Sequence, residues 1–221
     1  MISSSDFDSQ DGDSNFRRNF NARKDIADDT HAVIKSFRFL ELKSDALLEV
    51  GSSTGFVLAR LQELTSAKIA VGLEISSEAV AWANQEWKNC SFVNGSLDSI
   101  PPSILSKKFD CIILGFYLFL VEPMKWNKHI LSALELLSEG GHLIVYDFYS
   151  PHISLERTYL HNNDLTVHKS SFLFELDVLP GIVKTFQWCW MDNYGGQVAF
   201  NEYTGVCVYK KLSIDQSYIK T

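Results

Sequence analysis

The feature that most constrains the fold is a regular alternation of short apolar segments with segments of helical spacing, which begins at residue 46. The first apolar segment, 46–50, is followed by a glycine-containing turn and a helical pattern over 56–64. Short strands that alternate with amphipathic helices are typical of a parallel sheet covered by helices on both faces. We therefore predict an α/β, Rossmann-like, doubly wound fold. The further strands expected are 68–73, 91–93, 109–115 and 142–148, and the further helices expected are 29–40, 77–88 and 125–137.

The last third of the chain changes character. Two long β-like runs, 181–190 and 199–210, are separated by Asn193–Gly196 (NYGG), which is typical of a turn. We therefore expect a mostly parallel seven-stranded sheet that ends in an antiparallel β-hairpin. The predicted organisation is a disordered segment 1–14, one domain 15–212 with an acceptor-pocket insert 150–180, and a tail 213–221.

Composition narrows the range of partners. The 20 basic and 27 acidic residues give a formal net charge of −7, and the only dense basic pair is Arg17–Arg18, which argues against nucleic acid. The four cysteines form no CxxC pair, so we expect free thiols in a reducing compartment and no metal site. No apolar run reaches the length of a membrane span, and the first residues lack the pattern of a secretory signal. We expect a cytoplasmic protein that acts on a small molecule; its oligomeric state is not predicted.

The turn after the first strand, in LLEVGSSTG (47–55), carries the strongest chemical signal. Gly51 and Gly55 allow the backbone to approach a ligand closely, and the helix that follows presents unpaired N–H groups. The dinucleotide pattern GxGxxG would require glycine at position 53, where Ser53 stands, and this mismatch argues against NAD or FAD. Glu49, at the end of the strand, suits a cationic ligand group. A purely structural turn is the alternative.

Two later strand ends add polar groups. Glu74 ends the second strand, and a carboxylate there can accept hydrogen bonds from both hydroxyls of a ribose; a solvated helix cap is the alternative. After the third strand, Ser96 and Leu97 are candidates to contact an adenine ring, with Ile75 on its other side. An ordinary Asn-Gly turn at 94–95 is the alternative there.

Five segments in order resemble the successive motifs of class I S-adenosylmethionine-dependent methyltransferases: LLEVGSSTG, VGLEIS, FVNGSL, FDCIILG and LLSEGGHLIVYD. The resemblance covers about residues 45–150, and the hairpin extends it to about 210. It implies a methyltransferase with S-adenosylmethionine as cofactor. Ser53 replaces a glycine of the family, and Ser96 stands where the family commonly has an aspartate. The cofactor-binding residues that the resemblance implies are Glu49, Gly51, Ser52, Ser53, Gly55, Glu74, Ile75, Ser96, Leu97, Gly115 and Phe116.

A weaker similarity concerns bacterial methylases of surface-sugar (pseudaminic acid-type) biosynthesis. It rests on FRRNFN near the start and on the His-containing segment 147–172. It adds Arg18 to the cofactor site and implies a carbohydrate-type acceptor, such as a nucleotide sugar or a polysaccharide precursor. Arg157, His161 and Lys169 would suit an anionic acceptor of this kind.

A hydroxyl acceptor would also need a base near the methyl group. Asp147 at the end of the fifth strand, His161 and His168 are the candidate catalytic residues, although each histidine fits a surface or packing role as well. Two other functions remain open. One is a nicotinamide-dependent oxidoreductase, against which Ser53 and the absence of a YxxxK pair argue; the other is a non-catalytic binding protein with the methyltransferase fold.

Overall fold

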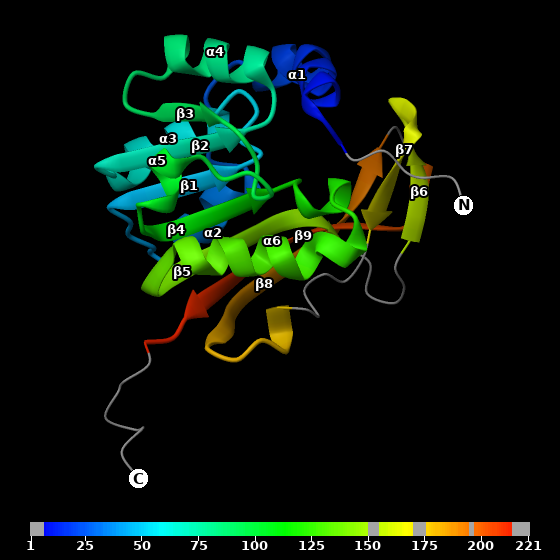
Figure 1. Ribbon diagram of the computed structural model, residues 1–221. Coiled ribbons are helices and arrows are strands. Elements are labelled where there is room, and N and C mark those ends of the chain that lie inside the picture. Colours follow the sequence, from blue (N-terminus) through cyan, green and yellow to red (C-terminus); the bar gives the residue numbers. More distant parts are fainter. Residues whose placement is uncertain (1–6, 150–154, 170–175, 195–196, 214–221) are drawn as a thin grey trace.

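The computed structural model describes residues 7–149, 155–169, 176–194 and 197–213. Its centre is a seven-stranded sheet with the strand order β3-β2-β1-β4-β5-β9-β8 (Figure 1). The first five strands run parallel, and β9 pairs antiparallel with both β5 and β8. The predicted fold class is confirmed. The strands are β1 (Ala46–Val50), β2 (Ile69–Glu74), β3 (Ser91–Asn94), β4 (Phe109–Gly115), β5 (Leu137–Tyr149), β8 (Ile182–Tyr194) and β9 (Gln197–Lys211).

Helices cover both faces of this sheet. The core on one face contains α2 (Ala32–Phe39), α3 (Phe56–Thr65) and the buried side of α4 (Ser77–Glu86). The core on the other face contains α5 (Pro102–Leu105), the short helix η1 (Leu118–Leu120) and α6 (Pro123–Leu136). Strand β1 lies between β2 and β4, and all five of its residues are buried, as a strand with two covered faces requires. The turn that follows β1 therefore starts from a strand that is buried and paired on both sides.

Two predicted boundaries are corrected by the structure. Residues 1–14 were expected to be disordered, but α1 (Ser9–Arg23) begins within them; Asp8 and Asp11 form a capping box at its start. The predicted helix 125–137 and strand 142–148 leave Gly140–Gly141 between them as a break. Instead β5 begins at Leu137, and Gly140, with a φ of 75°, lies inside the strand, next to the shift of register between β4 and β5.

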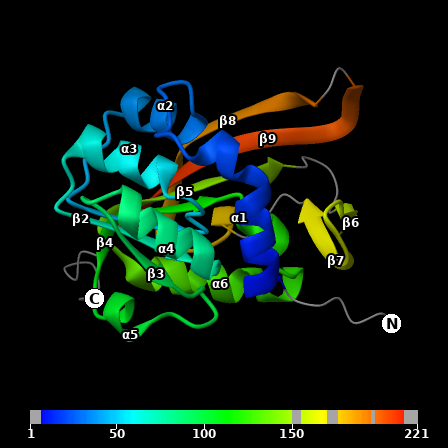
Figure 2. The same ribbon diagram turned by 90° about the horizontal axis from the view of Figure 1, so that it is seen from above.

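A separate hairpin lies in the predicted insert. It consists of β6 (Leu155–Tyr159) and β7 (Asn162–Lys169), which pair antiparallel. Viewed from above, α1 runs across the ends of the sheet strands, between the sheet and this hairpin (Figure 2). The remainder of the insert, 150–154 and 170–175, and the tail 214–221 lie outside the described residues.

Prediction for the core. The substitution Gly72→Ala would place a methyl group in β2 that overlaps the Phe92 ring and lies 2.6 Å from Ser52 Oγ. We expect a loss of about 1–3 kcal/mol in the free energy of unfolding, since overpacking forces neighbours apart. Denaturant titration measures it. The control is Gly115→Ala, whose new methyl group would have Glu49 Oε1 at 3.9 Å as its nearest contact. Equal stability of the two variants would contradict the prediction.

Candidate functional site

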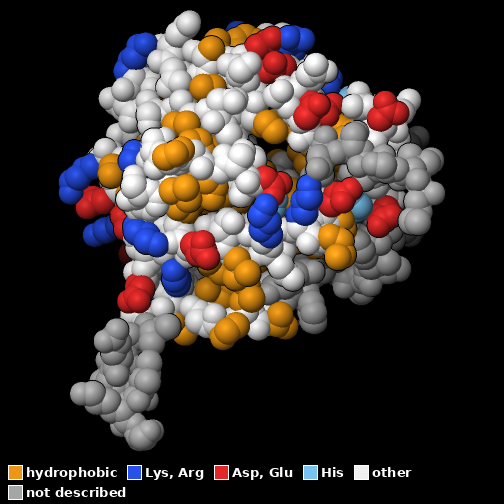
Figure 3. Space-filling view, in the orientation of Figure 1, with side chains coloured by type: hydrophobic (Ala, Val, Ile, Leu, Met, Phe, Trp, Pro, Cys, Tyr) orange, Lys and Arg blue, Asp and Glu red, His pale blue; other side chains and the backbone are white. Residues whose placement is uncertain are grey.

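A cavity of about 620 Å³ lies at the carboxyl ends of the parallel strands. Residues of β1, β2 and β4 and of the turns that follow them line its floor, and α1 covers it through Gly12, Phe16 and Asn19. Its mouth is visible as a dark hollow near the centre of the molecule in Figure 3. Open α/β sheets bind ligands at this edge. Of the predicted residues, the cavity wall contains Glu49, Gly51, Ser52, Ser53, Glu74, Ile75, Ser96, Gly115, Phe116 and His161.

The turn after β1 has the conformation that its glycines predict. Gly51 and Gly55 have φ values of 71° and 74°, and Ser53 has a φ of 50°. Ser53 therefore keeps the left-handed backbone that a glycine would adopt without strain. Gly55 does not line the cavity; it is the N-cap of α3 and lies against the Phe92 ring.

Glu74 connects this turn to the next one. Its Oε2 accepts a hydrogen bond from Ser53 N at 2.7 Å, and its Oε1 accepts one from Ser76 N at 2.8 Å. The side chain is 7% exposed, and burial raises the pKa of this carboxyl above its ordinary value, against the backbone hydrogen bonds that lower it. The Ile75 N–H also lowers this pKa. A carboxylate has about four acceptor sites, so capacity remains for a ligand hydroxyl.

Glu49 lies beside it at the end of β1. Its Oε2 accepts a hydrogen bond from Leu58 N at 3.1 Å. Burial raises the pKa of Glu49 to about 8, and the nearby charge of Glu74 adds to this rise. The side chain thus prefers to be uncharged until a cation reaches it.

Two arginines of α1 lie differently with respect to this wall. Arg18 lies outside the cavity, where its guanidinium donates to Tyr159 Oη at 3.2 Å. Arg23, the last residue of α1, lines the cavity instead, and its charge lowers the pKa values of both Glu49 and Glu74. Thr54 Oγ1 donates to the Arg23 carbonyl and holds this end of α1 on the turn. Which arginine reaches the cavity depends on how α1 packs against the turn. No local sequence pattern indicates that packing.

A further acid of the cavity wall follows β3. Leu97 is 2% exposed within the core and does not reach the cavity, whereas Asp98 does. Asp98 Oδ1 lies 2.5 Å from Lys128 Nζ, and Oδ2 lies 3.1 Å from His129 Nε2. Partial burial opposes ionisation of Asp98, but the Lys128 hydrogen bond and the nearby His129 hold its pKa below the ordinary value. An acid thus lies at the cavity wall two residues after Ser96.

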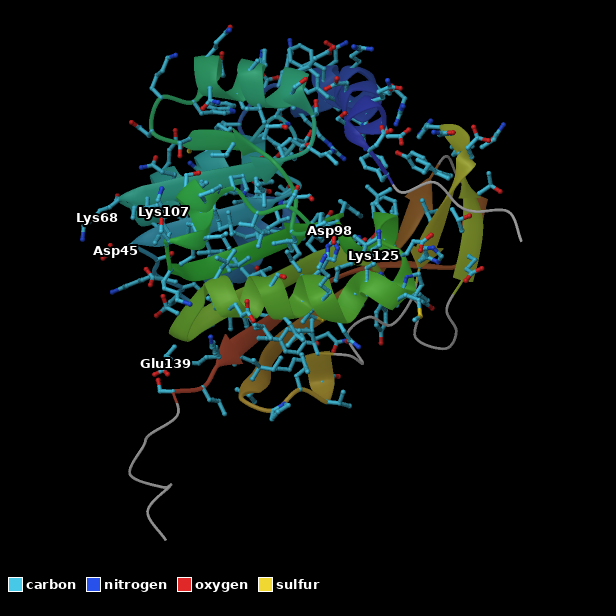
Figure 4. The ribbon with its side chains drawn as sticks, viewed as in Figure 1. Asp45, Lys68, Asp98, Lys107, Lys125 and Glu139 are labelled. Atoms are coloured by element: carbon cyan, nitrogen blue, oxygen red, sulfur yellow. The ribbon has the colours of Figure 1, made fainter. Side chains whose placement is uncertain are left out.

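Figure 4 shows where this acid lies. Asp98 and Lys125 lie close together at the cavity end of the sheet, while Asp45, Lys68 and Glu139 lie toward the opposite end. Asp98 and Lys125 also both line the cavity. Charged side chains therefore gather where the loop after β3 meets the start of α6.

The predicted catalytic residues are not brought together. Asp147 is 2% exposed and accepts hydrogen bonds from Phe148 N at 2.7 Å and Phe119 N at 3.3 Å; it is not part of the cavity wall. Burial raises its pKa to about 7. His168 is 6% exposed and packs edge-on against Trp126, also away from the cavity. His161 alone of the three lines the wall, where its ring meets Tyr159 edge-on.

Two features are absent from the part of the chain that the structure describes. It contains no group of three or more His, Cys, Asp or Glu side chains arranged to hold a metal ion. None of its helices is long and apolar enough to cross a membrane.

Prediction for Glu49. A carboxyl whose pKa is raised on folding stabilises the protein fully below its unfolded pKa, near 4.5, and this contribution is lost as the pH rises through the folded pKa, about 8. The side chain in Glu49→Gln stays uncharged. We therefore expect the free energy of unfolding of this variant, relative to that of the unmodified protein, to increase by on the order of 1–4 kcal/mol between pH 5 and 9. Asp147 titrates in both proteins, so its contribution cancels in the difference between their free energies of unfolding. Denaturant titrations at several pH values, with exposed Glu135→Gln as control, measure the difference; parallel curves for Glu49→Gln would refute it.

The comparisons with known proteins agree with this architecture. A family model described as a methyltransferase domain matches residues 47–141. A curated relative, carboxy-S-adenosyl-L-methionine synthase 1 of Yersinia pseudotuberculosis, is 28% identical over 109 residues, which are 45% of this chain; the match spans 44% of the relative, less than half of its length.

Solved structures resemble the chain over most of its length. One is an S-adenosylmethionine-dependent methyltransferase of Methanosarcina mazei, with 15% identity, a TM-score of 0.62, and coverage of 83% of this chain and 99% of that one. Another is the 1,6-didemethyltoxoflavin-N1-methyltransferase of Burkholderia thailandensis, with 15% identity, a TM-score of 0.66, and coverage of 90% and 85%. Residues 47–141 thus match a methyltransferase domain, and the chain as a whole has the fold of the class I methyltransferases.

Proposed function

We propose that the protein is an S-adenosylmethionine-dependent methyltransferase that acts on a small-molecule acceptor. The observation that carries the proposal is Glu74, a buried carboxylate that two backbone N–H groups fix at the cavity wall. A carboxylate has about four acceptor sites, so Glu74 keeps capacity to accept from the hydroxyls of a ribose. The matched methyltransferase domain contains this residue.

The residues around Glu74 fit the rest of the cofactor. Arg23 would bind the methionine carboxylate, and Glu49, buried and ready to ionise beside a cation, would face the ammonium group. Ile75, Ser96 and Asp98 line the wall on the far side of Glu74 and would enclose the adenine. Open space at Gly115, where an added Cβ would have only Glu49 Oε1 within 4 Å, leaves room for the sulfonium centre.

The cofactor supplies an electrophilic methyl group on a positively charged sulfur. The protein's task is then to align an acceptor atom with that methyl group and to keep water out. Phe116, with a φ of 47°, has a left-handed backbone conformation that is costly for a bulky residue. The backbone N–H of Phe116 donates to the Tyr146 carbonyl at 2.6 Å and holds this strained residue at the cavity wall, beside Gly115.

A second candidate acceptor is a nucleotide-linked or other carbohydrate, as the similarity to the surface-sugar methylases suggests. Of the three residues expected to bind it, His161 lines the cavity. Lys169 lies over the Phe148 ring, 4.2 Å from its centre, and the Arg157 side chain lies outside the described part of the structure. His161 is therefore the one observation that favours this acceptor.

Prediction for the ribose site. Calorimetric titration should show binding of S-adenosylhomocysteine, the reaction's product, and no comparable binding of NADH. Glu74→Gln should weaken the binding of S-adenosylhomocysteine by roughly 2 kcal/mol, about 30-fold, because a charged hydrogen-bond acceptor is lost. Glu135→Gln, on the exposed side of α6, should leave it unchanged. Tight binding of NADH would support the oxidoreductase instead, and binding without any methyl transfer to a broad set of acceptors would support the non-catalytic protein.

Prediction for the methionine end. Arg23→Met should weaken the binding of S-adenosylhomocysteine at least 10-fold, because the carboxylate loses a charged partner. The same variant should bind adenosine within about twofold of the unmodified protein, since adenosine has no carboxylate. Glu74→Gln should weaken both ligands. Equal losses of both ligands in Arg23→Met would show that Arg23 acts through the shape of the cavity and would refute this assignment.

A further inference from the structure

Aromatic side chains surround the part of the cavity beyond Gly115. The Phe116 ring lies 4.5 Å from that of Tyr146 and 4.9 Å from that of Phe148, and the rings of Phe119 and Phe148 are 5.1 Å apart. We call these four residues, with His31 and Phe56, the aromatic chamber. All six line the cavity.

His31 is the only residue of the chamber with an imidazole, and its position is fixed by the loop before α2. The Asp28 carboxylate accepts a hydrogen bond from Thr30 N at 2.7 Å, and His31 N donates to the Asp28 carbonyl at 3.3 Å. His31 is the N-cap of α2, but its side chain makes no capping hydrogen bond. The ring instead meets Tyr146 edge-on at 5.2 Å and Phe56 edge-on at 5.6 Å.

The imidazole has unused hydrogen-bonding capacity. Its Nδ1 is buried and has no hydrogen-bond partner among the described residues. A buried polar atom without a partner is costly, so a ligand that supplies the partner gains affinity. As placed, Nδ1 is closed off from the cavity, and a ligand can supply this partner only after the ring turns. A half turn of the ring about the Cβ–Cγ bond exchanges Nδ1 with Cδ2 and leaves the ring plane in place, so the nitrogen can reach either side.

The chamber favours an uncharged ligand. None of its six members is a carboxylate, a lysine or an arginine; the cation next to it is Lys169, whose Nζ lies 4.2 Å from the centre of the Phe148 ring. Burial, aided by the charge of Arg23, lowers the pKa of His31 to about 4, so the imidazole is neutral at ordinary pH. The charge of Arg23 also acts on Glu49 and Glu74, the two acids of the cofactor end. The other charged residues of the wall, Asp98, Glu122 and Lys125, belong to the loop after β3 and the start of α6.

We propose that the aromatic chamber binds an uncharged, planar aromatic acceptor, and that His31 forms a hydrogen bond with its hydroxyl or ring N–H group. The proposal rests on the proposed function and names the class of acceptor for it. Phe116, Tyr146 and Phe148 line the cavity with aromatic rings that pack at 4.5 and 4.9 Å, and an aromatic ligand can add to such a cluster by stacking or edge-on contact. The partner that His31 lacks is then provided by the polar atom of that ligand, next to the sulfonium end of the cofactor.

The test uses simple probes and protein saturated with S-adenosylhomocysteine. Equilibrium dialysis would compare 2-naphthol with naphthalene, which has the same rings and no hydroxyl, and with 2-naphthoate, which carries a negative charge. We expect 2-naphthol to bind about 5–10-fold more tightly than naphthalene and more tightly than 2-naphthoate. In His31→Phe the preference for 2-naphthol over naphthalene should disappear while naphthalene binds as before. His142→Phe, a half-buried histidine of β5 outside the cavity wall, should keep the preference.

Three results would overturn the proposal: no binding of 2-naphthol, tighter binding of 2-naphthoate, or an unchanged preference in His31→Phe. Transfer of a methyl group to UDP-glucose but not to any phenol would favour the carbohydrate acceptor and overturn it as well. Failure of S-adenosylhomocysteine itself to bind would refute the proposed function. Binding of that nucleoside without 2-naphthol would refute the aromatic acceptor alone, so the two failures are distinguishable.

Discussion

The interaction on which the site depends is the pair of backbone hydrogen bonds that Glu74 accepts. One comes from Ser53 in the turn after β1, and the other comes from Ser76 at the start of α4. The sheet places the ends of β1 and β2 next to each other, and the Glu74 carboxylate links the turns that follow them by hydrogen bonds. Burial makes the charged form costly, and the two N–H donors offset part of that cost. The same side chain therefore shapes the turn and remains available to a ligand.

The sequence was sufficient for features that local rules determine. Strands β1 and β4 have the predicted limits, 46–50 and 109–115, because buried parallel strands read as continuous apolar runs with glycine or polar residues at their ends. The polar cavity wall around Glu49, Gly51 and Glu74 was also predicted, because strand ends in such a sheet converge on one edge. Even Ser53, a departure from the family's glycine, keeps the expected backbone conformation.

Features that depend on tertiary packing were not predictable in this way. Helix α1 is polar and was taken as disordered at its start, yet Asp13 accepts hydrogen bonds from Ser76 Oγ at 2.6 Å and from Glu78 N at 3.2 Å, which fix it on α4. Arg23 and His31 reach the cavity only because α1 and α2 are held there. Asp147 stands near the end of β5, where a catalytic base is expected, but its side chain is buried outside the cavity wall and accepts hydrogen bonds from Phe119 N and Phe148 N.

Helix α1 connects parts of the molecule that the sheet does not join. Gly12 packs so closely on Ile75 that an added Cβ would lie 2.8 Å from its side chain, and Asp11 accepts a hydrogen bond from Asn162 of β7 at 2.8 Å. The helix is thus a shared wall between the nucleoside end of the cavity and the hairpin. Any molecule that fills the cavity must touch this wall, so occupancy and the anchoring of the amino-terminal helix reinforce each other. Helix α1, Ser9–Arg23, is in this sense a component of the binding equilibrium.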